Sequence, residues 1–258
     1  MNEKKTSLLY KIIKFFVLLF YPKMKIEGME NLPDGPAVVV GNHTQLHGPI
    51  SAELYFPGNH YIWCAGQMMK LKEVPGYAFE DFWSFKPWYS RWYYKLASFL
   101  VAPLSVCIFN NAHTIPVYRD SRLISTFRAT VSRLQEGAKV IIFPEHNKRY
   151  NNILYEFEDK FIDSARFYYK KTGQELSFVP MYIAPKLRKM VLGQPVRFCA
   201  ANPIEEERQR IRDYLMNEIT RLACELPEHT VVPYRNVPKK YYPKNRPLEV
   251  YVNDNDPG

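Results

Sequence analysis

Three short hydrophobic segments of the sequence each lead directly into side chains that could carry acid–base or anion-binding chemistry. The segments and the polar residues that follow them are 37–41 with His43, 114–118 with Arg119, and 139–143 with Glu145 and His146. A histidine exchanges protons near neutral pH, and a guanidinium binds anions. A carboxylate next to a buried segment needs a partner. Each residue alone has an ordinary structural explanation, but the set predicts a base, an acid and an anion-binding group at one sheet edge.

The elements that must position these residues are predicted to be alternating strands and helices. The segment 37–41 (AVVVG) is a β-branched run typical of a buried strand. Further strands are predicted at 61–65, 177–183 and 196–200, and helices at 121–136, 156–171 and 205–225. This alternation predicts a single α/β domain with a mixed, largely parallel sheet flanked by helices. In such sheets ligands bind beyond the carboxyl ends of the strands, where the polar residues are expected.

The composition narrows the classes of protein and of partner. With 258 residues, of which 47% are hydrophobic, the chain is long enough to bury a core and too apolar to be disordered. The formal net charge of +9 favours an anionic partner, which composition alone leaves as nucleic acid, phospholipid headgroups or a phosphorylated substrate. Four cysteines without C-x-x-C spacing are expected to be reduced and to form neither disulfides nor a zinc site: Cys64, Cys107, Cys199 and Cys224.

The N-terminal segment is expected to associate with a membrane surface. Residues 8–21 (LLYKIIKFFVLLFY) are apolar but are interrupted by Lys11 and Lys14. The run is shorter than the roughly 20 residues that span a bilayer, so it predicts an amphipathic helix lying in the headgroup region. A helix that covers the protein's own core is the alternative. A second apolar run, 96–109, is also expected to be too short to span, and helix breaks are predicted near Pro87 and Pro103.

We therefore divide the chain into an N-terminal helix (1–24), a central domain (25–232) and a basic tail rich in tyrosine and proline (233–258). The tail could bind an anionic membrane surface. A solvated, mobile end is the alternative.

Four sequence blocks resemble the motifs of a known family. They are Asn42-His43 after a hydrophobic segment, IPVYR at 115–119, FPE at 143–145 and VPM at 179–181. In order and approximate spacing they are similar to the motif blocks of the glycerolipid acyltransferases, the PlsC-like 1-acylglycerol-3-phosphate acyltransferase superfamily, over roughly residues 25–200. The resemblance implies transfer of a fatty acyl group from acyl-CoA or acyl-carrier protein to a lysophospholipid hydroxyl in phospholipid biosynthesis. It also implies a location at the cytoplasmic face of the cell membrane, with lipid, acyl donor and an anionic membrane surface as partners.

The same resemblance implies roles for individual residues. His43 would be the general base, and Glu145 would order the site. Arg119, together with His146 or Lys148, would hold the phosphate of the acceptor. Neither a metal nor a cofactor is implied, since the acyl donor is a substrate.

Two positions depart from the family's motifs. The aspartate of the family's His-x4-Asp motif is absent and Gly48 stands in its place, and His146 replaces the glycine of the third block. In a serine protease triad, loss of the orienting aspartate lowers kcat about 10⁴-fold. A catalytically impaired member that binds lipid or acyl donor without turnover is therefore the alternative. Substitution of Gly48 by aspartate is expected to raise activity if the fold accepts the larger residue, and the side chains that could replace the aspartate are those of Glu53, His47 and Glu145.

Two further classes of function are disfavoured. His43 and His47 have the spacing of a helical pair of metal ligands, but they follow a predicted strand and turn rather than lie within a helix. A nucleic-acid partner would explain the positive charge, but the basic residues are diffuse and form no recognisable nucleic-acid-binding module. We therefore expect no nucleic acid among the partners.

Overall fold

The computed structural model describes residues 6–83 and 86–251, and the chain divides into two compact units. Unit 1 comprises residues 1–22 and 62–126, and unit 2 comprises residues 23–61 and 127–258. The ends of the predicted N-terminal segment (1–5) and of the predicted tail (252–258) lie outside the described residues. Each unit is described by itself.

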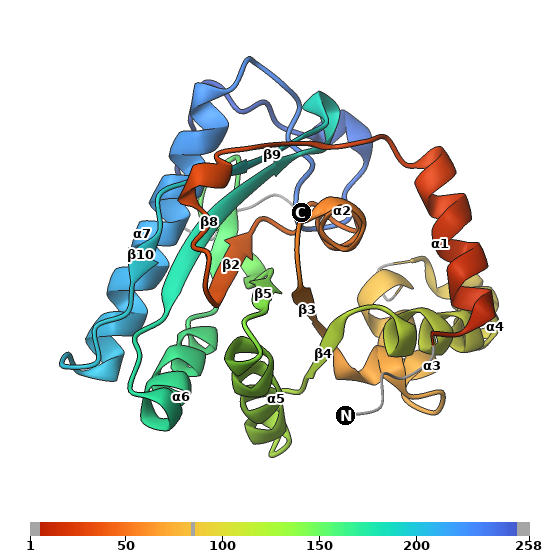
Figure 1. Ribbon diagram of the computed structural model, residues 1–258. Coiled ribbons are helices and arrows are strands. Elements are labelled where there is room, and N and C mark those ends of the chain that lie inside the picture. Colours follow the sequence, from red (N-terminus) through yellow and green to blue (C-terminus); the bar gives the residue numbers. More distant parts are fainter. Residues whose placement is uncertain (1–5, 84–85, 252–258) are drawn as a thin grey trace. The chain divides into compact units, whose positions relative to one another are not determined.

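Unit 2 is built on a mixed, largely parallel sheet flanked by helices, which confirms the predicted α/β fold class (Figure 1). Its strands lie in the order β1–β9–β8–β2–β5, and β10 also pairs with β8. The pairs β1–β9, β8–β2 and β2–β5 are parallel, whereas β9 and β10 run antiparallel to β8. The strand bounds are β1 (Lys25–Glu27), β2 (Ala37–Gly41), β5 (Lys139–Ile142), β8 (Ser177–Ala184), β9 (Lys189–Leu192) and β10 (Val196–Arg197).

The central strands are apolar throughout because both of their faces are covered. Every residue of β2 is buried, as are the last three residues of β5 and the last seven of β8. In the parallel register Val40 lies opposite Ile142, and Gly41 lies opposite Met181. The carboxyl ends of β2 and β5 therefore meet at one edge, as the sequence predicts for the segments that lead to His43 and Glu145.

Of the helices of unit 2, α7 lies where it was predicted, α6 covers the second part of a predicted helix, and α2, which begins at His47, was not predicted. The bounds are α2 (His47–Tyr55), α6 (Asp163–Thr172) and α7 (Ile204–Glu225), with 3-10 turns η1 (Met29–Asn31), η5 (Lys160–Ile162), η6 (Pro185–Leu187) and η7 (Lys239–Tyr241). Helix α7 packs along β8 and buries Ile211, Leu215 and Ile219, which recur at four-residue spacing.

The prediction of a helix over 156–171 was wrong in its first part. A hairpin of β6 (Glu145–Arg149) and β7 (Tyr155–Phe157) precedes α6. Pairing of Glu145 with Phe157 and of Arg149 with Tyr155 holds residues 155–157 extended, so cross-strand pairing overrides the helical pattern there. Helix α6 ends at Gly173, which adopts the left-handed conformation (φ +71°) common at helix ends.

Unit 1 combines a strand pair with helices. Its elements are α1 (Leu8–Phe20), η2 (Gly66–Met69), α3 (Val74–Ala78), the π-turn η3 (Phe79–Trp83), η4 (Trp88–Ser90), α4 (Arg91–Asn111) and β4 (Thr114–Val117). Strand β3 (His60–Ala65) pairs parallel with β4, from Ile62 opposite Thr114 to Ala65 opposite Val117. Strand β3 and helix α5 (Leu123–Gln135) include residues of both units.

Helix α4 corrects two predictions. It continues through Pro103 without a break. Two contacts hold the half that follows the proline in line, because Ser105 Oγ donates to the Met68 carbonyl (2.9 Å) and Asn110 Nδ2 donates to the Met69 carbonyl (2.9 Å). Within the helical segment Trp88–Asn111, an 18-residue window has a mean hydropathy of 1.4, so this helix is long and apolar enough to cross a membrane by length and composition, and the expectation that the run is too short was wrong.

Candidate active site

His43 stands two residues beyond β2, and its backbone and its ring have separate partners in unit 2. Its ring Nδ1 makes a short hydrogen bond to the main-chain carbonyl of Gln45. A carbonyl oxygen is only an acceptor, so in the neutral imidazole the proton is on Nδ1 and the lone pair is on Nε2. Burial lowers the pKa of His43 below its ordinary value, although the bond to Gln45 opposes that shift. The neutral ring is therefore the form at pH 7, with Nε2 as the basic atom.

The turn that brings the Gln45 carbonyl to the ring is strained. Thr44 and Gln45 have φ values of +46° and +55°, in the left-handed region that residues with a side chain rarely adopt. Thr44 is 1% exposed, and its hydroxyl has no hydrogen-bond partner within residues 6–83 and 86–251. Backbone strain and unpaired buried polar atoms concentrate at functional sites in proteins. Both occur here in the residues that follow the histidine.

Glu145 orders the backbone around this turn. It begins β6, and both of its carboxylate oxygens accept main-chain N–H groups, from His43 (2.5 Å) and from Tyr155 (2.9 Å). Its side chain is buried, and desolvation raises its pKa to about 7, although the two N–H donors oppose the shift. The carboxylate thus ties the end of β2 to the β6–β7 hairpin.

The backbone around Gly48 leaves no room for the carboxylate that the resemblance implies at this position. The Gly48 N–H donates to the His43 carbonyl (3.0 Å), so the first turn of α2 rests directly on the backbone of His43. A Cβ atom at position 48 would lie 2.5 Å from that carbonyl oxygen and 3.0 Å from the Asn42 carbonyl oxygen. Both are main-chain atoms that cannot swing aside. The fold therefore does not accept aspartate at position 48. That acceptance was the condition for the expected gain of activity.

Two aromatic rings pack against the half-buried imidazole. Phe143, which follows β5, and Tyr234, from the tail, each pack edge-on against the His43 ring, with centroid distances of 5.5 and 5.6 Å. Tyr155 of β7 in turn contacts Tyr234 (5.6 Å). This apolar shell accounts for the burial that keeps the imidazole neutral.

The substrate-binding residues expected from the sequence lie in different places. His146 and Lys148 lie on β6 and share one partner on β7, since Glu156 is 3.6 Å from His146 Nε2 and 2.9 Å from Lys148 Nζ. Arg119 is exposed just beyond β4 and belongs to unit 1. Its approach to His43 stays a prediction, as do the roles of His146 and Lys148.

A second group of cations lies near the first turn of α2. Burial lowers the pKa of His47, and the positive charges of Lys186 (η6) and Lys239 (η7) lower it further. These lysines are far from His47 in sequence, and their position beside the turn that follows His43 was not predicted.

The tail packs on unit 2, which disfavours the alternative of a solvated end for residues 233–251. Asn245 is fully buried, and Arg246 donates to the carbonyls of Cys224 and Leu226 at the end of α7.

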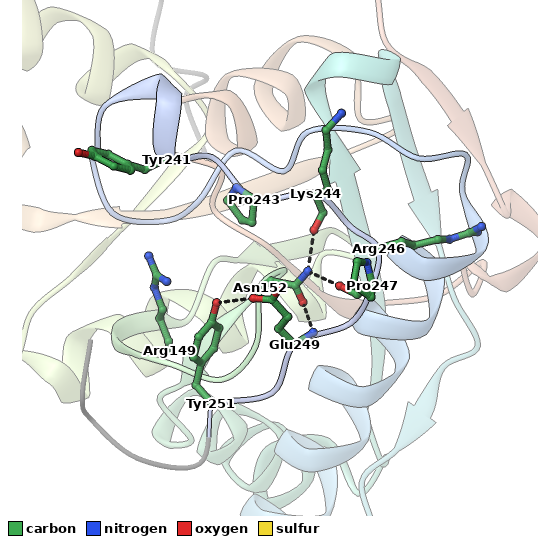
Figure 2. Close-up of a pocket in the computed structure, with 9 residues that line it drawn as sticks. All are labelled: Arg149, Asn152, Tyr241, Pro243, Lys244, Arg246, Pro247, Glu249 and Tyr251. Atoms are coloured by element: carbon green, nitrogen blue, oxygen red, sulfur yellow. Dashed lines mark hydrogen bonds between the residues drawn. The ribbon is translucent and has the colours of Figure 1, made fainter. Parts of the chain in front are cut away.

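A cavity of about 370 Å³ lies between the tail and the hairpin, and Asn152 is among the residues that line it (Figure 2). Asn152 Nδ2 donates to the carbonyls of Lys244 (2.6 Å) and Pro247 (2.9 Å) and so anchors the tail. The charged ends of Lys244 and Arg246 extend away from Asn152 in this view.

No group of three or more His, Cys, Asp or Glu side chains suited to hold a metal ion occurs within the described ranges 6–83 and 86–251. All four cysteines are free thiols, and burial raises the pKa of Cys64 to about 12.

Sequence reasoning missed three residues of the site: Gln45, Tyr234 and Tyr242. Gln45 contributes a main-chain carbonyl, which any residue type would supply, so no sequence signal marks it. The tyrosines lie in a tail that has no periodic pattern, about 190 residues from the histidine.

Comparisons with known proteins find similarity among solved structures, at low sequence identity. No family model matches the sequence, and no curated protein matches it. Among solved structures, the chain is similar to the 1-acyl-sn-glycerophosphate (LPA) acyltransferase PlsC from Thermotoga maritima. The identity is 17%, the TM-score is 0.45, and the alignment covers 86% of this chain and 84% of that chain.

Proposed function

We propose that the protein transfers a fatty acyl group from acyl-CoA or acyl-carrier protein to the hydroxyl of a lysophospholipid similar to 1-acylglycerol-3-phosphate. His43 Nε2 removes the proton of the acceptor hydroxyl while its oxygen attacks the thioester carbonyl carbon. A C–O bond forms and the C–S bond breaks. The proton held on His43 then passes to the thiolate that leaves. The step needs a neutral base with its lone pair on Nε2.

The observation that carries this proposal is the hydrogen bond from His43 Nδ1 to the Gln45 carbonyl. It fixes the tautomer in the way that a carboxylate does in a catalytic triad. The loss of about 10⁴ in kcat on changing the triad aspartate to asparagine arises because the wrong tautomer is favoured. Since the Gln45 carbonyl favours the correct tautomer, that loss does not apply in full.

What a neutral carbonyl cannot supply is full stabilisation of the imidazolium. A hydrogen bond to a charged group contributes about 1.5–3 kcal/mol, against about 0.5–1.5 kcal/mol for a neutral pair. The difference of about 1–1.5 kcal/mol corresponds to a rate about tenfold below that of a histidine–aspartate pair. We therefore expect a slower enzyme rather than an inactive protein.

For the acceptor's phosphate, we propose the residues expected from the sequence, Arg119 with His146 or Lys148. The hairpin already pairs the last two with Glu156, so a phosphate there would compete with that carboxylate. Glu145 acts as a positioning residue, because its oxygens hold main-chain N–H groups.

Membrane association is proposed through unit 1. Helices α1 and α4 contact each other, and the Ser7 N–H donates to Asn111 Oδ1 (2.8 Å). Both helices expose large apolar side chains, including Phe15 (62%) and Phe20 (80%) on α1 and Leu100 (74%) on α4. Trp88, Tyr89, Trp92 and Tyr93 gather at the start of α4 and are exposed as well, and such residues are enriched at membrane interfaces. This surface supports a peripheral or monotopic protein, which we place at the cytoplasmic face.

The test is acyl transfer by the full chain with lysophosphatidate and a long-chain acyl-CoA. The reaction is measured as the release of free thiol from acyl-CoA. We expect His43→Gln to lower kcat about 10²- to 10⁴-fold, because it removes the base but keeps the main-chain N–H that Glu145 binds. His113→Gln, an exposed histidine of unit 1, is the matched control.

A His43→Gln variant with the wild-type rate would exclude His43 as the base. A wild-type protein that binds lysophosphatidate or acyl-CoA but releases no thiol would favour the alternative of binding without turnover.

A further inference from the structure

The tail forms a closed loop beside the candidate base. The Val231 N–H donates to the Pro243 carbonyl (2.9 Å), and Thr230 pairs with Lys244 in an isolated antiparallel β-bridge. The two ends of residues 231–243 therefore meet. Buried Asn245 locks the junction, because its Oδ1 accepts the N–H of His229 (2.8 Å). We call residues 231–243 the C-terminal loop. Compact surface loops with pinned ends are frequently functional.

The C-terminal loop holds the turn that carries His43. Gln45 Nε2 donates to the hydroxyl oxygen of Tyr242 (2.9 Å) and to the main-chain carbonyl of Arg235 (3.2 Å). Tyr234, from the same loop, packs its ring edge-on against the imidazole (5.6 Å). Gln45 is thus held through its side chain by the loop, while its own carbonyl accepts the Nδ1 proton of His43.

The backbone of Gln45 needs such a restraint. Two consecutive non-glycine residues, Thr44 and Gln45, are left-handed, and such conformations persist only where the surrounding structure holds them. If the Gln45 side chain is released, the peptide can relax and its carbonyl can turn away from Nδ1. The imidazole would then lose the acceptor that fixes its tautomer.

We propose that Tyr242 is a positioning residue, through which the C-terminal loop holds the Gln45 carbonyl against His43 Nδ1 and keeps Nε2 as the basic nitrogen. The effect on catalysis rests on the proposed function, whereas the effect on the tautomer does not. The groups that contact His43 are the Gln45 carbonyl and the rings of Phe143 and Tyr234, together with Glu145, which binds its main-chain N–H.

The test compares Tyr242→Phe with Tyr241→Phe in the full chain. Tyr242→Phe keeps the ring and removes the acceptor oxygen, while Tyr241 is the adjacent, 62% exposed tyrosine and is the matched control. The first readout is the tautomer of His43 from ¹⁵N–¹H long-range NMR of histidine-labelled protein, assigned with His43→Gln. The second is kcat and KM with lysophosphatidate and acyl-CoA. Gln45→Met, which removes the donor from the other side, repeats the test if Tyr242→Phe is poorly folded.

We expect wild type and Tyr241→Phe to show the Nδ1–H tautomer and Tyr242→Phe to show a mixture of both tautomers. We expect kcat to fall about three- to tenfold with KM unchanged, because one neutral hydrogen bond is lost. If the tautomer and kcat of Tyr242→Phe and Gln45→Met equal those of Tyr241→Phe, the proposal is overturned. If wild type releases no thiol, the proposed function fails, and the tautomer comparison alone then decides the role of Tyr242.

Discussion

Replacing Glu145 by alanine is the perturbation that tests the architecture of the site most directly. The carboxylate is buried and accepts two main-chain N–H groups, from His43 (2.5 Å) and Tyr155 (2.9 Å). In Glu145→Ala both donors lose their acceptor. A buried donor left unsatisfied costs about 1–3 kcal/mol, so the variant should be destabilised by about 2–6 kcal/mol. That is a large part of the 5–15 kcal/mol, roughly, that stabilises a typical domain.

The size of this effect should depend on pH. Burial raises the pKa of Glu145 from 4.5 to about 7, so the folded state binds this proton more tightly than the unfolded state does. The contribution of this group is fully present below about pH 4.5 and is lost as the pH rises through about 7, where the buried carboxyl must ionise. The loss amounts to about 3 kcal/mol. Glu145→Ala lacks this slope, so its deficit relative to wild type should shrink as the pH rises.

The assay is urea denaturation at about pH 4.5 and about pH 8, with unfolding monitored by far-UV circular dichroism. Tryptophan fluorescence is unsuited, because all four tryptophans belong to unit 1: Trp63, Trp83, Trp88 and Trp92. Hydrogen exchange in peptides that contain His43 and Tyr155 gives a local readout. Glu30→Ala, at an exposed glutamate of unit 2, is the control and should change stability by less than about 0.5 kcal/mol. A deficit for Glu145→Ala below about 1 kcal/mol at the lower pH, or an unchanged pH slope, would refute the reasoning.

Two further predictions concern other positions, Gly48 and Leu100. Gly48→Asp should destabilise unit 2 by more than about 1 kcal/mol and leave thiol release unimproved, because its Cβ would lie 2.5 Å from the His43 carbonyl oxygen; a stable variant with raised kcat would contradict this. Leu100→Asp should weaken binding to anionic phosphatidylglycerol vesicles at least tenfold, roughly, because burial of a leucine contributes about 1.5–3 kcal/mol. Ile124→Asp, at a 56% exposed residue of α5, is the control in a vesicle sedimentation assay; equal binding by Leu100→Asp and this control would exclude the α4 surface.

Much of the fold was predictable from local patterns. The β-branched run 37–41 and the segment 139–143 became buried parallel strands, because residues buried on both faces must be apolar throughout. Their parallel register then brings His43 and Glu145 to one edge. Helix α7 was predicted over 205–225 and is observed at Ile204–Glu225.

Predictions from local sequence patterns were wrong where contacts between residues distant in sequence outweigh the local conformational preference. Residues 156–157 carry a helical pattern but are held extended by pairing with β6. Pro103 carries a helix-breaking signal, but side chains on both turns that follow it hold α4 in line through η2.

The sequence by itself predicted that His43 and Glu145 lie together beyond the end of β2, and its resemblance to the acyltransferase motifs implied a carboxylate where Gly48 stands. Only the tertiary structure decided which group contacts Nδ1 of His43. The acceptor of the Nδ1 proton is a main-chain carbonyl, which every residue possesses, and its direction depends on two left-handed residues held by a loop that is about 190 residues away. Backbone direction at a strained turn is set by packing from distant parts of the chain, and no local pattern encodes it.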